Sequence, residues 1–301
     1  MRDDKVALAI MLSLLALVLF DLMGLIIKLM STHYSAAELS AYRNFIGLIP
    51  SFIALWSSRA WHNKGRVMKI RQWKLACARG VITAFAQFFF YFSLGRMAFA
   101  TASTITYANA LFMTALAVPL LGERVGPARW LAVSVGFLGV MMIVRPGGDS
   151  FSTDALFPLA AAFLYALSGV LARRIDTEVP SALINLYSST ASLIGAMILA
   201  LATGGFSELH TGTDVFWICA MGVFGGSAVL LLVISVRMTE QSNLAPFNYF
   251  GILIAFVFGW LFFGEAPVDD LLPGAFLIAF GGLLIVWRER RIRQTRTSSA
   301  T

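Results

Sequence analysis

The chain has 301 residues, of which 58% are hydrophobic and 13% are charged, and its mean hydropathy is +0.79. Soluble domains contain about 45–50% apolar and about 25% charged residues, so this composition excludes an ordinary soluble enzyme and a disordered chain. The formal net charge of +7 is expected on loops at one face of a lipid bilayer, not on a surface that binds nucleic acid, and no nucleic-acid partner is predicted.

Ten apolar segments follow one another along the chain, and most have the ~20 residues that a membrane-spanning helix needs. We predict spanning helices at residues 6–30, 36–56, 78–95, 98–121, 127–145, 155–173, 180–203, 213–236, 242–263 and 271–287. The first is longer than the ~7–15-residue apolar core of a signal peptide, so we expect it to be retained. A basic tail, 288–301, follows the last segment. The predicted fold class is an all-α integral membrane protein.

Lysine and arginine are distributed unevenly between the two sets of connections. With the N-terminus inside, nineteen of the 23 lie on the inner side, many of them in the connection after the second span. Only Lys28, Arg96 and Arg145 lie outside, and Arg43 lies within the second span. Because cytoplasmic loops carry an excess of basic residues, we predict that both termini are cytoplasmic.

The sequence repeats itself in two halves. The matches are Tyr107 with Tyr249, Gly122-Glu123 with Gly264-Glu265 and Gly139 with Gly281 (offset 142), Arg96-Met97 with Arg237-Met238 (offset 141), and Gly24, Lys28 and Tyr42 with Gly169, Arg173 and Tyr187 (offset 145). The halves, residues 6–145 and 155–287, each contain five predicted spans, so the second enters the membrane from the opposite side. Two inverted repeats with a site at their interface are typical of secondary transporters.

Each half contains a string of residues that ends in Gly-Glu. The first is Ala100-Thr-Ala-Ser-Thr-Ile-Thr-Tyr-Ala-Asn-Ala-Leu-Phe112, which runs on to Pro119-Leu-Leu-Gly-Glu-Arg124, and the second is Ala245-Pro-Phe-Asn-Tyr249, which runs on to Gly259-Trp-Leu-Phe-Phe-Gly-Glu265. These strings resemble the EamA domain, of which the drug/metabolite transporter superfamily carries two copies. The resemblance implies the ten-span fold and secondary transport of a small-molecule metabolite across the inner membrane of a bacterium.

The resemblance also narrows the expected substrate. Members of the superfamily export amino acids and drugs or take up metabolites, and Ala-Pro-Phe-x-Tyr is most similar to alphaproteobacterial-type members that import S-adenosylmethionine or riboflavin. We therefore expect uptake of riboflavin or of a metabolite like S-adenosylmethionine, with export of amino acids or drugs as the alternative. The Gly-Glu motif itself is interpreted structurally: glycine ends a helix, and glutamate faces water beside the N-terminus of the next helix.

Two opposite charges lie deep in the first two spans. Asp21 is about nine residues, roughly 13 Å, below the outer face, and Arg43 is about seven residues, roughly 10 Å, below the same face. Because ionised groups are costly inside a bilayer, we predict that they pair, either as part of a functional site or as a structural ion pair. Asn44 is adjacent and would extend the network, and Asp21 is the candidate proton carrier.

Polar residues in other spans are candidates for lining a substrate cavity. They are Gln87 in the third span, Ser103, Thr106, Tyr107 and Thr114 in the fourth, Tyr165 and Ser168 in the sixth, Asn185, Tyr187 and Ser188 in the seventh, and Asn243, Asn248 and Tyr249 in the ninth. Amides and phenols need hydrogen-bond partners in an apolar medium, although small hydroxyl residues also pack helices together. Few fixed charges accompany them, which favours a neutral or zwitterionic, partly apolar substrate.

Other classes of protein fit the sequence less well. A zinc protease needs H-E-x-x-H, which is absent, and an aspartyl intramembrane protease needs two deep carboxylates, of which the sequence has one. A serine intramembrane protease needs a histidine within a span, whereas His33, His62 and His210 all fall in loops. No pore-filter repeat, soluble signalling domain or P-loop occurs, so a channel, a sensor and an ATPase are disfavoured. We predict no enzyme activity, no cofactor, no metal site, and either a monomer or a homodimer.

Overall fold

The computed structural model describes residues 2–122, 126–144, 152–176, 178–238, 244–265, 267–281, 283–284 and 287, and these residues form helices and turns without any strand. The helices are α1 (Arg2–Met30), α2 (Ala36–Trp56), α3 (Arg59–Asn63), α4 (Trp73–Leu94), α5 (Phe99–Thr106), α6 (Asn109–Leu121), α7 (Pro127–Val144), the 3₁₀ turn η1 (Thr153–Ala155), α8 (Leu156–Ala172), α9 (Ser181–Ala202), α10 (Gly212–Met238), the 3₁₀ turn η2 (Ala245–Tyr249), α12 (Phe250–Phe263) and α13 (Val268–Leu271). A further helical stretch covers 274–281. The predicted all-helical fold is confirmed.

Six helical segments of the described chain are long and apolar enough to cross a membrane. They are Val6–Met30, Trp73–Leu94, Phe99–Leu121, Thr153–Ala172, Ser181–Ala202 and Gly212–Leu232, and two shorter apolar segments are Trp130–Val144 and Phe247–Phe263. The second predicted span corresponds to α2, which has 21 residues. It is more polar than these six segments because it carries Glu38 and Arg43. The last predicted span, 271–287, lies partly outside the described residues.

Large apolar side chains are exposed along the outside of the helices. Met11 and Leu261 are each 65% exposed, and Phe45 is 67% exposed. Soluble monomers rarely expose so much apolar surface, whereas these side chains would contact lipid tails in a bilayer. Trp56 and Trp287, at the ends of the second and tenth predicted spans, are exposed as well, as is common for tryptophans at the membrane–water interface.

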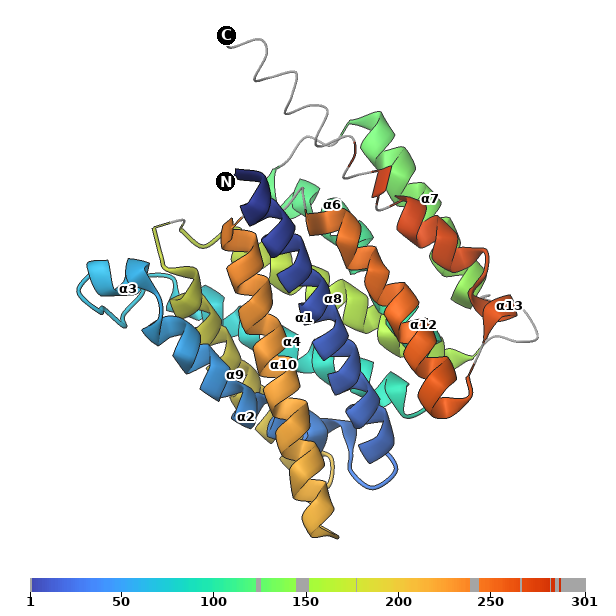
Figure 1. Ribbon diagram of the computed structural model, residues 1–301, viewed down its shortest axis with the longest axis horizontal. Helices are drawn as coiled ribbons and strands as arrows, with labels where there is room; N and C mark the ends of the chain where they lie inside the picture. Colours follow the sequence, from blue (N-terminus) through green and yellow to red (C-terminus); the bar gives the residue numbers. More distant parts are fainter. Residues whose placement is uncertain are drawn as a thin grey trace.

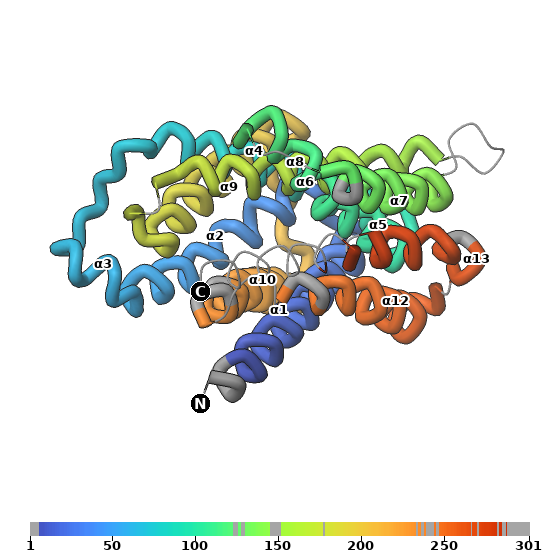
Figure 2. The backbone as a smooth tube through the Cα atoms, turned by 90° about the horizontal axis from the view of Figure 1, so that it is seen from above, coloured from blue at the N-terminus to red at the C-terminus, as the bar shows by residue number. Residues whose placement is uncertain are grey.

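The helices form two groups with α2 between them. Figure 1 shows α1 flanked by α10 and α12, and α1 packs against both. Seen from above (Figure 2), α4, α8 and α9 lie on one side of the molecule, and α1, α10 and α12 lie on the other. Since α2 contacts both α9 and α10, it connects the two groups.

Contacts between the two halves come in matching pairs. α1 of the first half packs on α10 of the second, and α4 of the first half packs on α8 of the second. In the same way, the contact of α2 with α10 is matched by the contact of α9 with α4, and the contact of α1 with α12 is matched by the contact of α8 with α6. The helices α2 and α9, which occupy the same position in the two repeats, pack on each other. Exchanging the two halves therefore leaves this set of contacts unchanged.

Glycine ends a helix at the two positions where the sequence predicts it. Gly122 follows α6 with φ 67° and Gly264 follows α12 with φ 65°, both in the left-handed region that glycine adopts without strain. This part of the interpretation of the Gly-Glu motif is confirmed. Glu123 lies outside the described residues.

Polar contacts at the ends of the helices divide the connections between helices into two groups. Tyr34 donates to Asp214 (2.8 Å), and Arg96 pairs with Asp154 (3.5 Å). In the other group, Lys64 pairs with Glu178 at 2.8 Å. Each of these contacts joins connections that the sequence analysis assigns to the same side of the membrane.

Candidate functional site

A network of buried polar side chains lies between α2, α4 and α9, and we call it the polar seam. It consists of Ser40, Asn44, Gln87 and Ser192. Asn44 Nδ2 donates to Gln87 Oε1 (2.8 Å) and to Ser192 Oγ (3.2 Å), and both serine hydroxyls also donate to Gln87 Oε1 (3.2 and 3.4 Å). Two predicted site residues, Asn44 and Gln87, thus contact each other directly in the core.

The seam belongs to a longer polar stripe on α4. The stripe consists of Arg79, Thr83, Gln87 and Tyr91, spaced four residues apart on one helix face. Arg79 Nε donates to the Ser168 carbonyl (3.2 Å) and Nη1 to Ser188 Oγ (3.0 Å), while the Thr83 and Ser168 hydroxyls lie 2.8 Å apart. The predicted third span, 78–95, includes Arg79, but the sequence analysis counted it only among the basic residues of the inner side. The four-residue spacing to Thr83 and Gln87 was the signal that could have placed all three on one helix face.

Arg43 reaches from α2 across to α10. Its Nη1 donates to Asn44 Oδ1 (3.0 Å) and its Nη2 to the Gly225 carbonyl (3.3 Å), while Nε is buried without a hydrogen-bond partner. A Cβ at Gly225 would lie 2.8 Å from Arg43 Nε and 2.5 Å from Met23 Sδ. Only a glycine at this position leaves room for the guanidinium beside α10.

Asp21 does not pair with Arg43, and the predicted ion pair is wrong. Asp21 is 6% exposed, and its Oδ2 is buried with no hydrogen-bond partner. Arg43 meets α1 at Met23, and residues two apart on a helix point in nearly opposite directions, because each residue turns the helix by about 100°. Asp21 instead lies within electrostatic range of Tyr107. Similar depth in the bilayer therefore did not place the two side chains on facing surfaces.

The fourth and ninth predicted spans both change their winding at the same point of the repeat. α5 ends at Thr106 and α6 begins at Asn109, and the Ala108 amide donates to the Ile105 carbonyl, three residues back. In the second half, the 3₁₀ turn η2 ends at Tyr249 and α12 follows. Short 3₁₀ stretches inside longer helices often mark functional hinges, and here they occur at the matching tyrosines Tyr107 and Tyr249.

Both tyrosines lie where the two halves meet. The Tyr107 ring lies against the backbone of Gly251, where a Cβ would come 1.6 Å from the phenol oxygen. Tyr249 is 9% exposed and lies in an apolar cluster that joins Ile105 of the first half to Ile278 of the second. Tyr107 packs against the same cluster and touches the helix that follows the break in the other half.

The hydroxyl residues of the fourth span also differ from one another. Thr106 Oγ1 donates to the Ala102 carbonyl (2.9 Å) and Thr114 Oγ1 to the Ala110 carbonyl (3.2 Å), so both are satisfied within their own helices. Ser103 is 3% exposed, and its hydroxyl has no partner. Of these three side chains, Ser103 has an unused hydrogen-bonding group.

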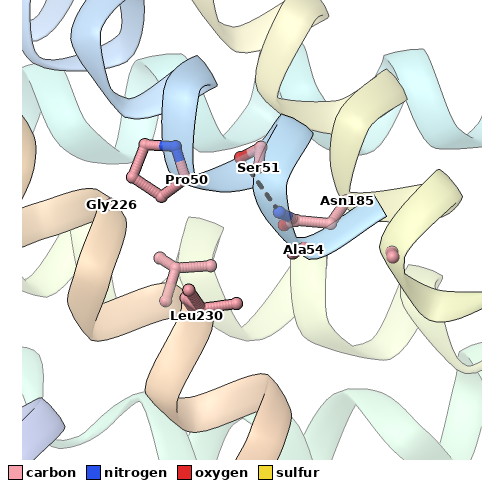
Figure 3. A pocket seen from close by; sticks show the side chains of 8 residues that line it. Pro50, Ser51, Ala54, Asn185, Gly226 and Leu230 are labelled. Atoms are coloured by element: carbon pink, nitrogen blue, oxygen red, sulfur yellow. Dashed lines mark hydrogen bonds between the residues drawn. The ribbon is translucent and has the colours of Figure 1, made fainter. Parts of the chain in front are cut away.

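Asn185 lines a separate small pocket between α2, α9 and α10 (Figure 3). Its Nδ2 donates to Ser51 Oγ (3.2 Å), and Pro50, Gly226 and Leu230 complete the wall that Figure 3 labels. The cavity has a volume of about 10 Å³, far below the ~300–1,000 Å³ of a pocket for a drug-sized ligand. Passage of a metabolite here therefore requires the helices to move apart.

The remaining predicted side chains are spread around this centre. Tyr165 on α8 is within electrostatic range of Tyr91 and Arg43, so it lies near the polar stripe. Asn248 is half-buried in η2. Tyr187 donates to the Met68 carbonyl (3.0 Å) in the connection between α3 and α4, so the prediction that it faces the cavity is wrong. Asn243 lies outside the described residues.

Lys28 and Glu265 form an ion pair at one end of the molecule, and each of their charged atoms has a partner. Lys28 Nζ lies 2.5 and 2.7 Å from the two carboxylate oxygens of Glu265, and it also donates to the Met97 carbonyl (3.0 Å). Glu265 Oε2 accepts the Phe99 amide at 2.9 Å, at the N-terminus of α5. The prediction that Glu265 faces water beside the next helix is therefore wrong, because the turn at Gly264 directs it to helices of the first half.

Known proteins support a transport role for this architecture. The chain is 32% identical to the riboflavin transporter of Rhizobium johnstonii over 57% of this chain and 56% of that protein. It is 23% identical to the S-adenosylmethionine uptake transporter of Rickettsia bellii over 92% of this chain and 93% of that protein. It is 25% identical to the pseudopaline exporter CntI of Pseudomonas aeruginosa over 91% and 94% of the two chains.

The family assignment covers both halves of the chain. The EamA-like transporter family matches residues 7–145 and again residues 153–287. Together these matches include the two spans that change their winding at Tyr107 and Tyr249, and the helices that carry the polar seam. The chain belongs to the EamA-like transporter family and contains two EamA repeats.

Proposed function

We propose that this protein is a secondary transporter that takes up riboflavin or a metabolite like S-adenosylmethionine across the cytoplasmic membrane of a bacterium. The observation that carries the proposal is the change of winding at Tyr107 and Tyr249, next to buried polar groups that lack partners. Interrupted helices beside polar groups near the middle of the membrane are the usual substrate sites of transporters built from repeats.

The proposed architecture has ten spans in two inverted repeats, residues 6–145 and 155–287, with both termini and the tail 288–301 in the cytoplasm. Three observations support it. The contacts between halves occur in exchangeable pairs, the contacts between connections respect the predicted sides, and basic residues are concentrated on one side. In such a fold, alternating access comes from rocking one half against the other around a fixed site.

The proposed substrate-binding set joins side chains from both halves. Its members are Asp21, Arg43, Asn44, Gln87, Ser103, Tyr107, Tyr165, Asn185, Asn248 and Tyr249. Asp21 is the proposed proton carrier, because burial without a counter-ion favours a neutral carboxyl and contact with water favours an ionised one. Since one chain supplies both halves, a monomer or a homodimer would work equally well.

Uptake into vesicles tests the proposed function. Vesicles that contain the purified protein should accumulate labelled riboflavin or labelled S-adenosylmethionine above empty vesicles, and Tyr107→Ala should reduce this uptake. If neither compound accumulates, uptake of these metabolites is refuted.

Export is the second candidate, because the similar protein from Pseudomonas aeruginosa is named as an exporter. Vesicles preloaded with labelled amino acids distinguish the two directions. Faster efflux than from empty vesicles, without uptake of riboflavin or S-adenosylmethionine, would favour the exporter.

A further inference from the structure

Arg43 is a cation in the core without a carboxylate partner. Within the described part of the chain, Lys28 and Arg96 each have an acidic partner, but no carboxylate forms an ion pair with Arg43. Its guanidinium is held by uncharged acceptors, the Asn44 side chain and the Gly225 carbonyl. Removing a charge from water is costly unless a counter-charge accompanies it, so an anion that reaches Arg43 would be stabilised.

The guanidinium retains unused donors in a suitable arrangement. An arginine has five N–H donors in a planar fork, and Arg43 uses one on Nη1 and one on Nη2 for Asn44 and Gly225. Its Nε–H group is buried and has no partner. Nε–H and an N–H of Nη2 can donate in parallel to the two oxygens of a carboxylate. This edge of the guanidinium lies against Gly225, so a carboxylate reaches it when α2 and α10 move apart.

The position of Arg43 fits a ligand that is held between the two halves. Arg43 comes from α2 of the first half, and it lies against Gly225 on α10 of the second half, beside Met23 of α1. An anion bound here would contact both halves, and rocking of the halves would expose it to either side in turn.

We propose that Arg43 binds the carboxylate of the transported metabolite. This inference rests on the proposed function and selects between its two substrates, because S-adenosylmethionine carries a carboxylate and riboflavin carries none. A single guanidinium among uncharged groups suits a carboxylate better than a phosphate, which is usually held by several cations. The sequence analysis favoured a neutral or zwitterionic substrate because few fixed charges accompany the polar residues, and a zwitterion with one carboxylate agrees with that expectation.

Ligand-dependent stabilisation of the purified protein tests the proposal, because a ligand raises the melting temperature according to its affinity. The probes are S-adenosylmethionine, its decarboxylated form, riboflavin and riboflavin 5′-phosphate. The wild-type protein should bind S-adenosylmethionine about 10- to 100-fold more tightly than the decarboxylated form, as expected for a charged hydrogen-bonded contact. Arg43→Gln should bind these two compounds with nearly equal affinity.

Two further variants separate recognition from folding. Gly225→Ala keeps the charge of Arg43 but displaces its guanidinium, since the new Cβ would lie 2.8 Å from Nε, and it should lose the same preference for the carboxylate. Arg96→Gln is the matched control, because Arg96 is 55% exposed and paired with Asp154. It should retain the wild-type preference.

Several results would overturn the proposal. Equal weakening of both forms of S-adenosylmethionine by Arg43→Gln would make the residue structural. Stronger binding of riboflavin 5′-phosphate than of S-adenosylmethionine would indicate a phosphate site. Stabilisation by riboflavin alone, or by none of the four compounds, would also refute a carboxylate site. Vesicle uptake of riboflavin would then show that the proposed transport function stands without a carboxylate site at Arg43. Absence of all uptake would refute both the carboxylate site and the proposed transport function.

Discussion

Charged side chains in two regions of the bundle are satisfied to different degrees. At one end, the Lys28–Glu265 pair has contacts on every charged atom, including the Phe99 amide and the Met97 carbonyl. In the core, Asp21 Oδ2 and Arg43 Nε are both buried and both lack partners. Paired and unpaired charges thus occupy separate regions of the same protein.

This difference suggests different tasks for the two regions. A fully paired group stabilises the arrangement in which it is seen, because opening the contact leaves each partner unsatisfied. A buried group without a partner gains from any proton or ligand that completes it. The end region is therefore suited to hold one conformation, and the core is suited to respond to substrate.

Replacing Asp21 should produce the largest functional effect. Asp21→Asn preserves the shape of the side chain but cannot release a proton. If Asp21 carries the coupling proton, accumulation driven by an inward proton gradient should fall at least about 10-fold, within the range that a positioned proton-transfer group contributes. Exchange of labelled for unlabelled substrate across vesicles without a gradient should continue. Equal loss of both activities, or no loss of either, would contradict a role in coupling.

Replacing Gln87 should produce the largest loss of stability. Gln87→Leu removes the acceptor that Ser40, Asn44 and Ser192 share, and each buried donor left without a partner costs about 1–3 kcal/mol. Unfolding in detergent mixtures should therefore shift to a clearly lower denaturant fraction. Thr114→Val is the matched control, since Thr114 donates only to its own helix. A loss no larger than that of the control would mean that the seam is not mutually stabilising.

Breaking the Lys28–Glu265 pair should have an intermediate effect. Glu265→Gln removes the charge that faces Lys28 and weakens the acceptor for the Phe99 amide. Because the pair is only partly exposed, at 13% and 29%, we expect local opening to become easier by about 1–2 kcal/mol, roughly 5- to 30-fold. Hydrogen exchange of amides at the start of α5 should accelerate accordingly. Unchanged protection would show that the pair does not hold this end closed.

The sequence was sufficient for the all-helical fold but not for the breaks at Tyr107 and Tyr249 or for the directions of the side chains. Hydropathy and the repeat predicted an all-helical chain with glycine at the ends of α6 and α12, because these features depend on local chemistry. Depth along a span was also estimated, but the rotation of α1 about its axis was not. Asp21 and Met23 differ by two residues, and that difference decides which of them meets Arg43.

Contacts between distant segments explain the other differences. Arg79 was counted only among the basic residues of the inner side, yet α4 extends back to Trp73 and places it on the polar stripe. Glu265 was expected to face water, since nothing local indicates that Lys28 and Phe99 lie beside it. The roles of the predicted site residues depend on such packing and stay predictions.

The exposed pair Lys64–Glu178 should produce the smallest effect. Its side chains are 47% and 87% exposed, so water competes for both charges and salt screens them. The hydrogen bond from Lys64 lowers the pKa of the Glu178 carboxyl, so any stabilisation is present at neutral pH and disappears as the pH falls through that lowered pKa. Glu178→Gln makes the same chemical change as Glu265→Gln, yet its melting temperature should match the wild type at neutral and acidic pH. A loss as large as that of Glu265→Gln would mean that linking connections, and not burial and complete pairing, gives the Lys28–Glu265 pair its strength.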